Sequence, residues 1–256
     1  MNLKLKGKKA VITGATRGIG RAIAETLAAE GVDLGICARN EDAVKETVTT
    51  LKKFGGYVTG SAIDVANGPS LKAWIPEAGE SLGGIDILVC NASAMATLNN
   101  ESDWNISFQT DLMGTVRAVA AAKPFLERAG AQSGDASIVI ISSVSASEAF
   151  FESAYGATKA ALIHFAKGVA RREAGKHVRA NVVSPGMVYF KGSVWNTLEE
   201  QSPEVFKRSL GLNPMGRMAS PSEIASAVAF LASPVSSFTS GVNLVIDGAL
   251  VARVNY

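Results

Sequence analysis

The chain has 256 residues, of which 47% are hydrophobic and 19% charged, and a formal net charge of +2. This composition is typical of a soluble globular protein and excludes a disordered chain. The nearly balanced charge argues against a nucleic-acid-binding protein, which usually has a basic excess or a basic stripe. No apolar run reaches the roughly 18 residues of a membrane-spanning helix, and the polar, basic start lacks the apolar core of a signal peptide. We therefore expect a cytoplasmic protein with no nucleic-acid or membrane partner.

Short apolar runs alternate with helical stretches along the chain. Strands are predicted at residues 9–13, 32–38, 57–63, 85–90, 137–141, 178–183 and 242–246. Helices are predicted at 19–30, 41–53, 69–82, 104–126, 154–172 and 221–232, whereas 187–213 lacks periodicity. This alternation predicts an α/β fold, a doubly wound three-layer sandwich with a parallel sheet between helices. No repeat or linker interrupts it, so we expect one domain over residues 1–256. Functional residues should directly follow strands, because ligands bind outside the carboxyl ends of such sheets.

A glycine-rich loop, residues 13–20 (TGATRGIG), connects the first predicted strand and helix. Its glycines permit a tight turn, a close approach of the backbone to a pyrophosphate, and close packing of helix on strand. The helix start adds free N–H groups and the positive end of the helix dipole. This placement predicts a dinucleotide site, with a plain tight turn as the alternative. The expected contacts are Gly14, Thr16, Arg17, Gly18, Ile19 and Gly20.

The end of the second predicted strand indicates which dinucleotide binds. An acidic side chain there would hold the 2′-hydroxyl of NAD(H), whereas a 2′-phosphate needs an arginine. The nearby acid, Asp33, begins the strand and lies roughly 16 Å from its carboxyl end, at about 3.3 Å per residue. Arg39 follows the strand and Arg17 lies in the glycine loop, so two guanidinium groups can converge on a phosphate. We predict NADP(H); the alternative is that both arginines are ordinary surface residues.

Tyr155 and Lys159 are four residues apart near the start of a predicted helix, so they share one helix face. Phenols are poor bases at neutral pH, but a fixed cation beside one favours the phenolate and makes it a useful acid or base. Ser142 and Ser143 follow the fifth predicted strand, where a hydroxyl can hydrogen-bond a substrate carbonyl oxygen. A Tyr-x-x-x-Lys pair alone is common, but its combination with the glycine loop and a strand-end serine is specific.

Together these motifs resemble the short-chain dehydrogenase/reductase family in its compact single-domain form, over essentially the whole chain. Further matching segments are 64–65, 90–93, 181–186, 214–223, 230–233 and 241–248. The tail is similar to bacterial ketoreductases of the 3-oxoacyl-carrier-protein type. The resemblance implies a Rossmann fold with a seven-stranded parallel sheet in the order 3-2-1-4-5-6-7.

This strand order bears on the two cysteines, Cys37 and Cys90. The first strand would lie between theirs and separate them by about 9.5 Å, beyond the roughly 7 Å Cα limit of a disulfide. We expect two buried thiols and no disulfide. The two cysteines and two histidines also lack the spacing of metal ligands, so no metal site is expected.

Individual roles follow from the resemblance. It implies that Tyr155 is the general acid of carbonyl reduction, or the base of the reverse reaction, and that Lys159 holds the nicotinamide ribose and stabilises the phenolate. Ser143, twelve residues before Tyr155, matches the catalytic serine better than Ser142. The implied cofactor contacts beyond the glycine loop are Arg39, Asp64, Val65, Asn91, Ala92, Tyr155, Lys159, Pro185, Gly186 and Val188. A homo-oligomer, tetramer or dimer, is also implied.

Four positions depart from the family pattern. Asp111 stands where the family usually has the asparagine that is its fourth catalytic residue and supports a proton-relay water, and a carboxylate there adds negative charge near Lys159. Cys90 and Ser93 replace the usual asparagine and glycine after the fourth strand. Phe190 stands where a threonine usually binds the nicotinamide carboxamide.

The stretch 187–213 is long for a compact domain and is expected to be a substrate loop or lid. The alternative is that its apolar side chains are ordinary packing residues of a short helical flap. Tyr189, Val194 and Phe206 of this stretch, together with Phe150, could add apolar surface. The residues expected to contact an apolar or aromatic substrate are Ser143, Met95, Phe151, Phe190 and Trp195.

Three functions are compatible with these residues. The leading hypothesis is an NADPH-dependent carbonyl reductase that acts on an apolar ketone or a 3-oxoacyl thioester. A dehydrogenase that mainly oxidises a cyclic or aromatic alcohol is the second, because the same residues catalyse both directions. The third is a catalytically silent NADP-binding sensor, which Asp111 favours and the intact Ser143, Tyr155 and Lys159 disfavour.

Overall fold

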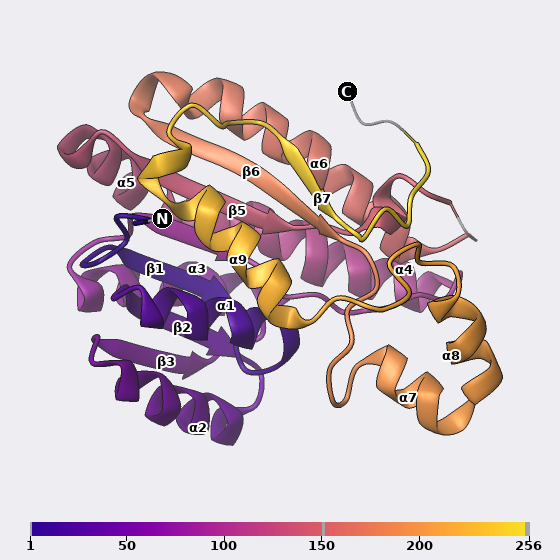
Figure 1. Ribbon diagram of the computed structural model, residues 1–256. Helices are drawn as coiled ribbons and strands as arrows, with labels where there is room; N and C mark the ends of the chain where they lie inside the picture. The colour runs from indigo at the N-terminus through magenta and orange to yellow at the C-terminus, as the bar shows by residue number, and fades with distance from the viewer. Residues whose placement is uncertain (1, 150–151, 254–256) are drawn as a thin grey trace.

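Seven parallel strands form one sheet between two helical layers, with α1 (Gly18–Ala29) and α9 (Pro221–Ala232) in front of the sheet in Figure 1. The computed structural model describes residues 2–149 and 152–253. The strand order is β3-β2-β1-β4-β5-β6-β7, so the predicted fold class is confirmed. The strands are β1 (Lys9–Thr13), β2 (Asp33–Ala38), β3 (Val58–Ala62), β4 (Ile87–Cys90), β5 (Ala136–Ile141), β6 (Val178–Pro185) and β7 (Asn243–Ile246).

The other helices connect these strands and extend the carboxyl edge of the sheet. They are α2 (Glu41–Leu51), α3 (Gly68–Leu82), α4 (Glu101–Ser107), α5 (Gly114–Ser133), α6 (Ala154–Glu173), α7 (Val194–Gln201) and α8 (Pro203–Leu210), with a π-helical segment η2 (Phe108–Met113) and 3₁₀ turns η1 (Lys52–Phe54), η3 (Val144–Ala146), η4 (Ala174–Lys176) and η5 (Pro234–Ser236). No helix within the described ranges is long and apolar enough to cross a membrane.

Alternate residues of the central strands pack on opposite faces of the sheet, as the period of two in a strand requires. In β1, Ala10 and Ile12 join the apolar cluster that includes residues of α1, α2 and α9, whereas Val11 joins the cluster of α3, α5 and α6. Cys37 and Cys90 pair with Thr13 from opposite sides of β1. Burial raises the pKa of both thiols to about 12.

The helix predicted at 104–126 begins earlier, ends later and is not a single α-helix. Asn100 caps α4, because its side chain accepts the N–H of Asp103 at 2.9 Å. The six residues of η2 then widen the helix before α5, which continues to Ser133. π-Turns of this kind often occur at functional sites, and this one carries Asp111.

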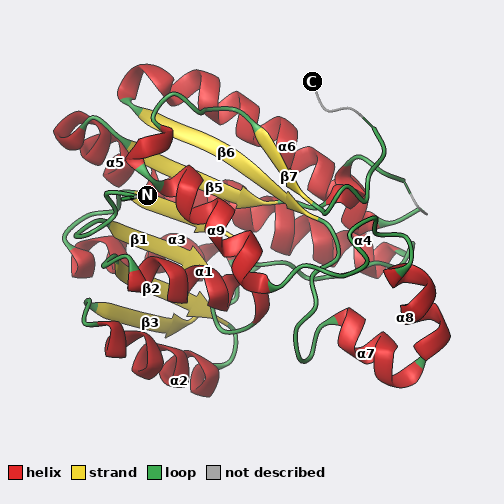
Figure 2. Cartoon of the chain, in the orientation of Figure 1, coloured by secondary structure: helices red, strands yellow, loops and turns green. Residues whose placement is uncertain are grey.

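The stretch predicted as irregular, residues 187–213, contains the short helices α7 and α8, and we call it the flap. Ser193 caps α7 and Pro203 begins α8. Neither helix buries a residue, which explains why no apolar periodicity marks them in the sequence. In Figure 2 both lie beyond the arrowheads of the strands, at the carboxyl edge of the sheet.

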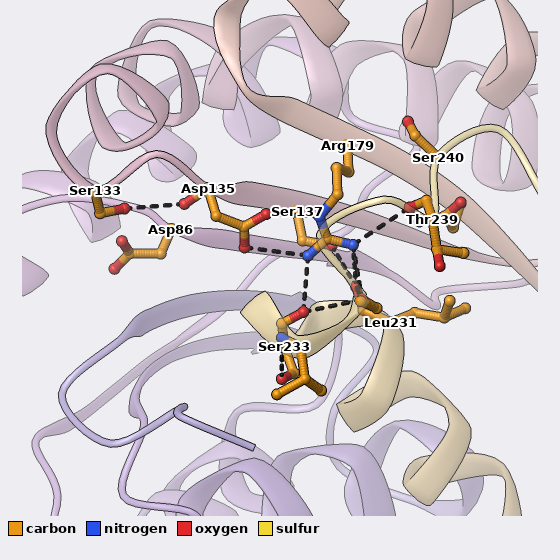
Figure 3. A network of polar contacts seen from close by, with 12 residues as sticks. Asp86, Ser133, Asp135, Ser137, Arg179, Leu231, Ser233, Thr239 and Ser240 are labelled. Carbon is orange, nitrogen blue, oxygen red and sulfur yellow. Dashed lines mark hydrogen bonds and ion pairs between the residues drawn. The ribbon is translucent and has the colours of Figure 1, made fainter. Parts of the chain in front are cut away.

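A buried polar network fixes the opposite, amino edge of the sheet (Figure 3). Arg179 of β6 binds both oxygens of Asp135 at 2.6 and 3.1 Å, and also donates to the carbonyl oxygens of Leu231 and Ser233, at the end of α9. The Ser233 hydroxyl donates to the carbonyl oxygen of Leu3. The network therefore joins β5, β6, α9 and the start of the chain, away from the edge that carries the flap.

Candidate active site

One cavity of about 680 Å³ lies at the carboxyl edge of the sheet, where the sequence predicts the site. It is bordered by the ends of several strands, by the glycine loop and by the flap. Of the predicted site residues, those that line it are Gly14, Thr16, Arg17, Ile19, Gly20, Arg39, Asp64, Val65, Asn91, Ala92, Met95, Ser143, Tyr155, Lys159, Pro185, Gly186, Val188, Phe190 and Trp195.

The glycine loop joins β1 to α1 and has the conformation expected of a phosphate-binding turn. Gly14 and Gly18 have φ of +70° and +53°, which favour glycine, and a Cβ on Gly20 would lie 2.1 Å from the carbonyl oxygen of Gly14. The Asn91 side chain holds this turn by donating to the carbonyl oxygens of Thr13 and Gly14 at 3.1 and 2.8 Å. No side chain caps the start of α1 and its first turn carries no acidic residue, so its N–H groups face the cavity unopposed.

Two exposed arginines border the end of the cavity beside β2. Arg39 directly follows β2, and Arg17 precedes α1 in the glycine loop. Asp33 lies at the other end of β2, where its carboxylate accepts the N–H of Tyr57 at 2.7 Å. The structure thus separates this acid from the cavity and leaves positive side chains there, as the sequence predicts.

Tyr155 and Lys159 lie on one face of α6 and both reach the cavity. The Lys159 Nζ is 5.5 Å from the centroid of the Tyr155 ring, and it donates to the carbonyl oxygen of Ile141 at 3.0 Å. Ser142 donates its hydroxyl to the carbonyl oxygen of Lys159 at 2.9 Å. The Ser143 oxygen accepts the N–H of Ser145 at 3.1 Å, which leaves the Ser143 hydroxyl hydrogen for another acceptor.

Asp111 lies behind Lys159 and forms a buried ion pair with it. The distance between Asp111 Oδ1 and Lys159 Nζ is 3.1 Å, and the two side chains are 1% and 2% exposed. The Asp111 backbone carbonyl accepts the Thr115 hydroxyl at 2.7 Å. The negative charge expected near Lys159 is therefore in direct contact with its ammonium group.

Comparisons with known proteins agree with this geometry. A family model described as enoyl-(acyl carrier protein) reductase matches residues 14–250. Isoepoxydon dehydrogenase PatN of Penicillium expansum is 36% identical over 259 residues, covering 96% of this chain and 95% of that protein. The 3-oxoacyl-(acyl-carrier-protein) reductase of Vibrio cholerae is 32% identical, with coverage of 97% and 99%. The chain belongs to the short-chain dehydrogenase/reductase family.

A solved structure extends the likeness to the whole fold of this short-chain dehydrogenase/reductase. L-Sorbose reductase of Gluconobacter frateurii, complexed with NADPH and L-sorbose, matches with a TM-score of 0.91 at 30% identity, covering 99% of this chain and 100% of that one. The chain is accordingly an oxidoreductase of this family.

Not every predicted residue of this short-chain dehydrogenase/reductase lies in the cavity. Gly18 does not line it, because the Phe190 ring covers the space where a Cβ of Gly18 would be, with Cζ at 2.4 Å. Tyr189 packs edge-to-face on Phe206 at 6.0 Å and donates to Glu199. These two aromatic rings stabilise the flap itself, whereas Trp195 faces the cavity.

The structure does not describe two residues that were predicted to add apolar surface near the substrate. Phe150 and Phe151 lie outside the described residues.

Several cavity residues of this short-chain dehydrogenase/reductase were not predicted from the sequence. Ile63 directly follows β3 and Ile141 ends β5, so the rule that ligands bind at carboxyl ends could have identified them. The remaining unpredicted residues include Ala38, Asn40, Ala43, Ser93, Ala94, Ile106, Thr110, Gly192 and Ser193. Ser142, considered beside Ser143 in the sequence, also lines the cavity. Ile106 and Thr110 belong to α4 and η2, whose boundaries the sequence does not reveal.

Proposed function

We propose that this protein is an NADPH-dependent carbonyl reductase that acts on an apolar ketone or a 3-oxoacyl thioester. The observation that carries the proposal is one continuous cavity, which joins the glycine loop and two arginines to the side chains of Ser143, Tyr155 and Lys159. A dinucleotide that binds along this cavity would have its phosphates at one end and its reactive ring at the other.

The residues at the glycine loop fit an NADP(H) molecule. A Cβ on Gly14 or Gly20 would collide with the backbone of Ala92 or Gly14, so these glycines permit the tight loop that a pyrophosphate site needs. The uncapped start of α1 offers N–H donors to a pyrophosphate. Arg17 and Arg39 provide two guanidinium groups for a 2′-phosphate. The similarity to an L-sorbose reductase complexed with NADPH supports the same choice.

The bound nicotinamide supplies the hydride, and the protein contributes orientation and one proton. The free hydroxyl hydrogen of Ser143 donates to the carbonyl oxygen of the substrate. Tyr155, at the same end of the cavity, gives its phenolic proton to that oxygen as the negative charge on it develops. Lys159 stabilises the resulting phenolate from beneath and offers an N–H to the ribose, while its other contacts fix its position.

The substrate end of the cavity has a largely apolar wall. Met95, Ile106, Val194 and Trp195 line it, and two of these residues belong to the flap. We propose that the flap acts as a lid that covers the substrate and excludes water. An apolar group attached to the carbonyl carbon suits this wall better than a charged group does.

Alcohol oxidation is the second candidate, and the similarity to PatN, a dehydrogenase by name, favours it. The same residues act in reverse, with the Tyr155 phenolate as the base. To separate the two candidates, kcat/KM for NADP⁺ reduction with a panel of cyclic and aromatic secondary alcohols is compared with kcat/KM for ketone reduction with NADPH. The main direction should give the larger value.

Binding and turnover test the proposal separately. Fluorescence titration should show tighter binding of NADPH than of NADH. Arg39→Asp should lower that preference by about tenfold or more, whereas Arg171→Asp, on the exposed face of α6, should leave it unchanged.

Tyr155→Phe should keep NADPH binding and lose about 100-fold or more in the rate of ketone reduction. An unchanged cofactor preference in Arg39→Asp contradicts the 2′-phosphate site. NADPH binding by the wild type without turnover of any ketone or oxoacyl thioester would instead support the sensor.

A further inference from the structure

Three hydrogen-bond donors surround the buried carboxylate of Asp111. The Ser93 hydroxyl donates to Oδ1 at 2.6 Å, the Ala94 N–H donates to Oδ2 at 2.8 Å, and the Lys159 ammonium lies 3.1 Å from Oδ1. A carboxylate accepts from all three, whereas an asparagine would turn an amide N–H toward one of them. The site is therefore built for an aspartate, and a neutral amide would leave a buried donor unpaired.

Ser93 has a defined orientation within this arrangement. Its oxygen accepts the N–H of Met95 at 3.2 Å, so its hydrogen points to Asp111. Met95 has φ of +53°, a conformation that residues other than glycine rarely adopt, and its side chain lines the substrate end of the cavity. The Ser93 hydroxyl thus connects the Asp111–Lys159 pair to the turn that aims Met95 into the cavity.

We propose that Ser93 and Asp111 are positioning residues that hold Lys159 as half of a buried, charge-balanced pair. The Lys159 Nζ donates to the carbonyl oxygen of Ile141 and lies 3.1 Å from Asp111 Oδ1, so these two contacts fix the ammonium group while a remaining N–H is available to a ribose hydroxyl. The inference rests on the proposed function only in assigning that last N–H to NADPH; the charge balance itself is a property of the folded chain.

A thermal double-mutant cycle at pH 7 tests the charge balance without any activity measurement. Lys159→Met leaves the Asp111 carboxylate buried without its cation, so the unfolding midpoint should fall by about 5–10 °C. Asp111→Asn in the Lys159→Met background should recover at least half of that loss, although Asp111→Asn alone lowers the midpoint. Additive midpoint changes, with no recovery in the double variant, would overturn the proposal.

NADPH binding tests the role of Ser93, and it remains informative if Lys159→Met does not fold. Ser93→Ala should raise the dissociation constant for NADPH by about 3–10-fold, because Asp111 loses a charge-assisted hydrogen bond. Ser93→Thr, which keeps the hydroxyl, should restore wild-type affinity. Ser226→Ala removes an exposed α9 hydroxyl that binds only the carbonyl oxygen of Ser222 and should have no effect.

The two experiments distinguish the possible failures. Equal NADPH affinity of wild type and Ser93→Ala would overturn the positioning role. Absence of NADPH binding by the wild type would contradict the proposed function, whereas the thermal cycle would still decide whether Asp111 and Lys159 form a charge-balanced pair.

Discussion

The ring of Phe190 lies directly over Gly18, at the start of α1. A Cβ at Gly18 would come within 2.4–2.8 Å of three atoms of this ring, and Gly18 is the glycine of the loop that does not line the cavity. With the pyrophosphate at the start of α1, as proposed above, the ring would cover part of its surface, and we expect the ring to move when the dinucleotide binds.

Replacement of this ring should speed up cofactor binding. We expect Phe190→Ala to raise the association rate constant of NADPH by about 3–10-fold, because the change removes a displacement step before binding. Stopped-flow fluorescence measures the rate. Phe54→Ala, at an exposed position on η1, is the control and should leave the rate unchanged. A slower association in Phe190→Ala would show that the ring contributes to the bound state instead.

Two glycines should respond to alanine in opposite directions. Gly20→Ala places a Cβ 2.1 Å from the carbonyl oxygen of Gly14, so the loop must shift, and NADPH binding should fall by about tenfold or more. Gly168, in the interior of α6, has nothing within 4 Å of an added Cβ. Gly168→Ala should stabilise the protein by about 0.5–1 kcal/mol in urea unfolding. Equal effects of the two variants would contradict this account of the loop.

Glu173, at the end of α6, should make stability depend on acid pH. Burial alone would raise the pKa of this carboxyl, but hydrogen bonds from Arg172, Lys123 and Lys176 outweigh burial and lower the pKa to about 2. A lowered pKa in the folded state means that the stabilisation is present above the usual value of 4.5 and is lost as the pH falls from there toward 2.

Urea unfolding between pH 3 and pH 7 tests this dependence. Glu173→Gln should destabilise the protein by about 1–3 kcal/mol at pH 6, and the difference from the wild type should shrink toward pH 3. Glu41→Gln, in the exposed pair with Lys45, should follow the wild-type curve. A difference that does not vary with pH would show that Glu173 acts through packing rather than charge.

Arg179 should contribute more to stability than an exposed arginine with equally short contacts. Its loss leaves the buried Asp135 carboxylate without its cation, whereas the carbonyl oxygens of Leu231 and Ser233 each lose one donor and keep a serine hydroxyl. Arg179→Met should destabilise the protein by about 3–5 kcal/mol in urea unfolding. Arg217→Met breaks the solvent-exposed pair with Glu223 and should change stability far less. Similar losses in both variants would refute the importance of burial here.

Exposed aromatic side chains on α4 and η2 support the expected homo-oligomer. Trp104 and Phe108 are 43% and 47% exposed and lie four residues apart, on one helix face. Light scattering of the wild type should give the mass of a dimer or tetramer, and Trp104→Glu with Phe108→Glu should shift it to a smaller species. A monomeric wild type would contradict the expectation.

The sequence predicts the strands, most of the helices and the edge of the sheet that carries the site. Alternation of strand and helix patterns indicates the fold class, and the carboxyl-edge rule brings Gly14, Arg39, Ser143 and Tyr155 together although they are far apart in the chain. The strand order itself comes with the family resemblance, because periodicity does not determine which strands are neighbours.

The remaining features depend on tertiary contacts that leave no pattern in the sequence. The helices α7 and α8 bury no residue, so their sequences lack the apolar stripe from which a helix is predicted. The donors around Asp111 come from two segments far apart in the sequence, the turn at Ser93 and Ala94 and the helix α6 with Lys159, and the π-turn that carries this carboxylate packs against α6. Likewise, only the folded chain reveals that Phe190 lies on Gly18.

The independence of α7 and α8 from both apolar clusters has a consequence for how such enzymes diversify. Residues 194–210 can be exchanged for the corresponding piece of a relative without rebuilding the interior. A chimaera of this kind should fold as before and acquire the substrate preference of the relative that supplied the segment. The same sheet can therefore support different substrates when only the flap is exchanged.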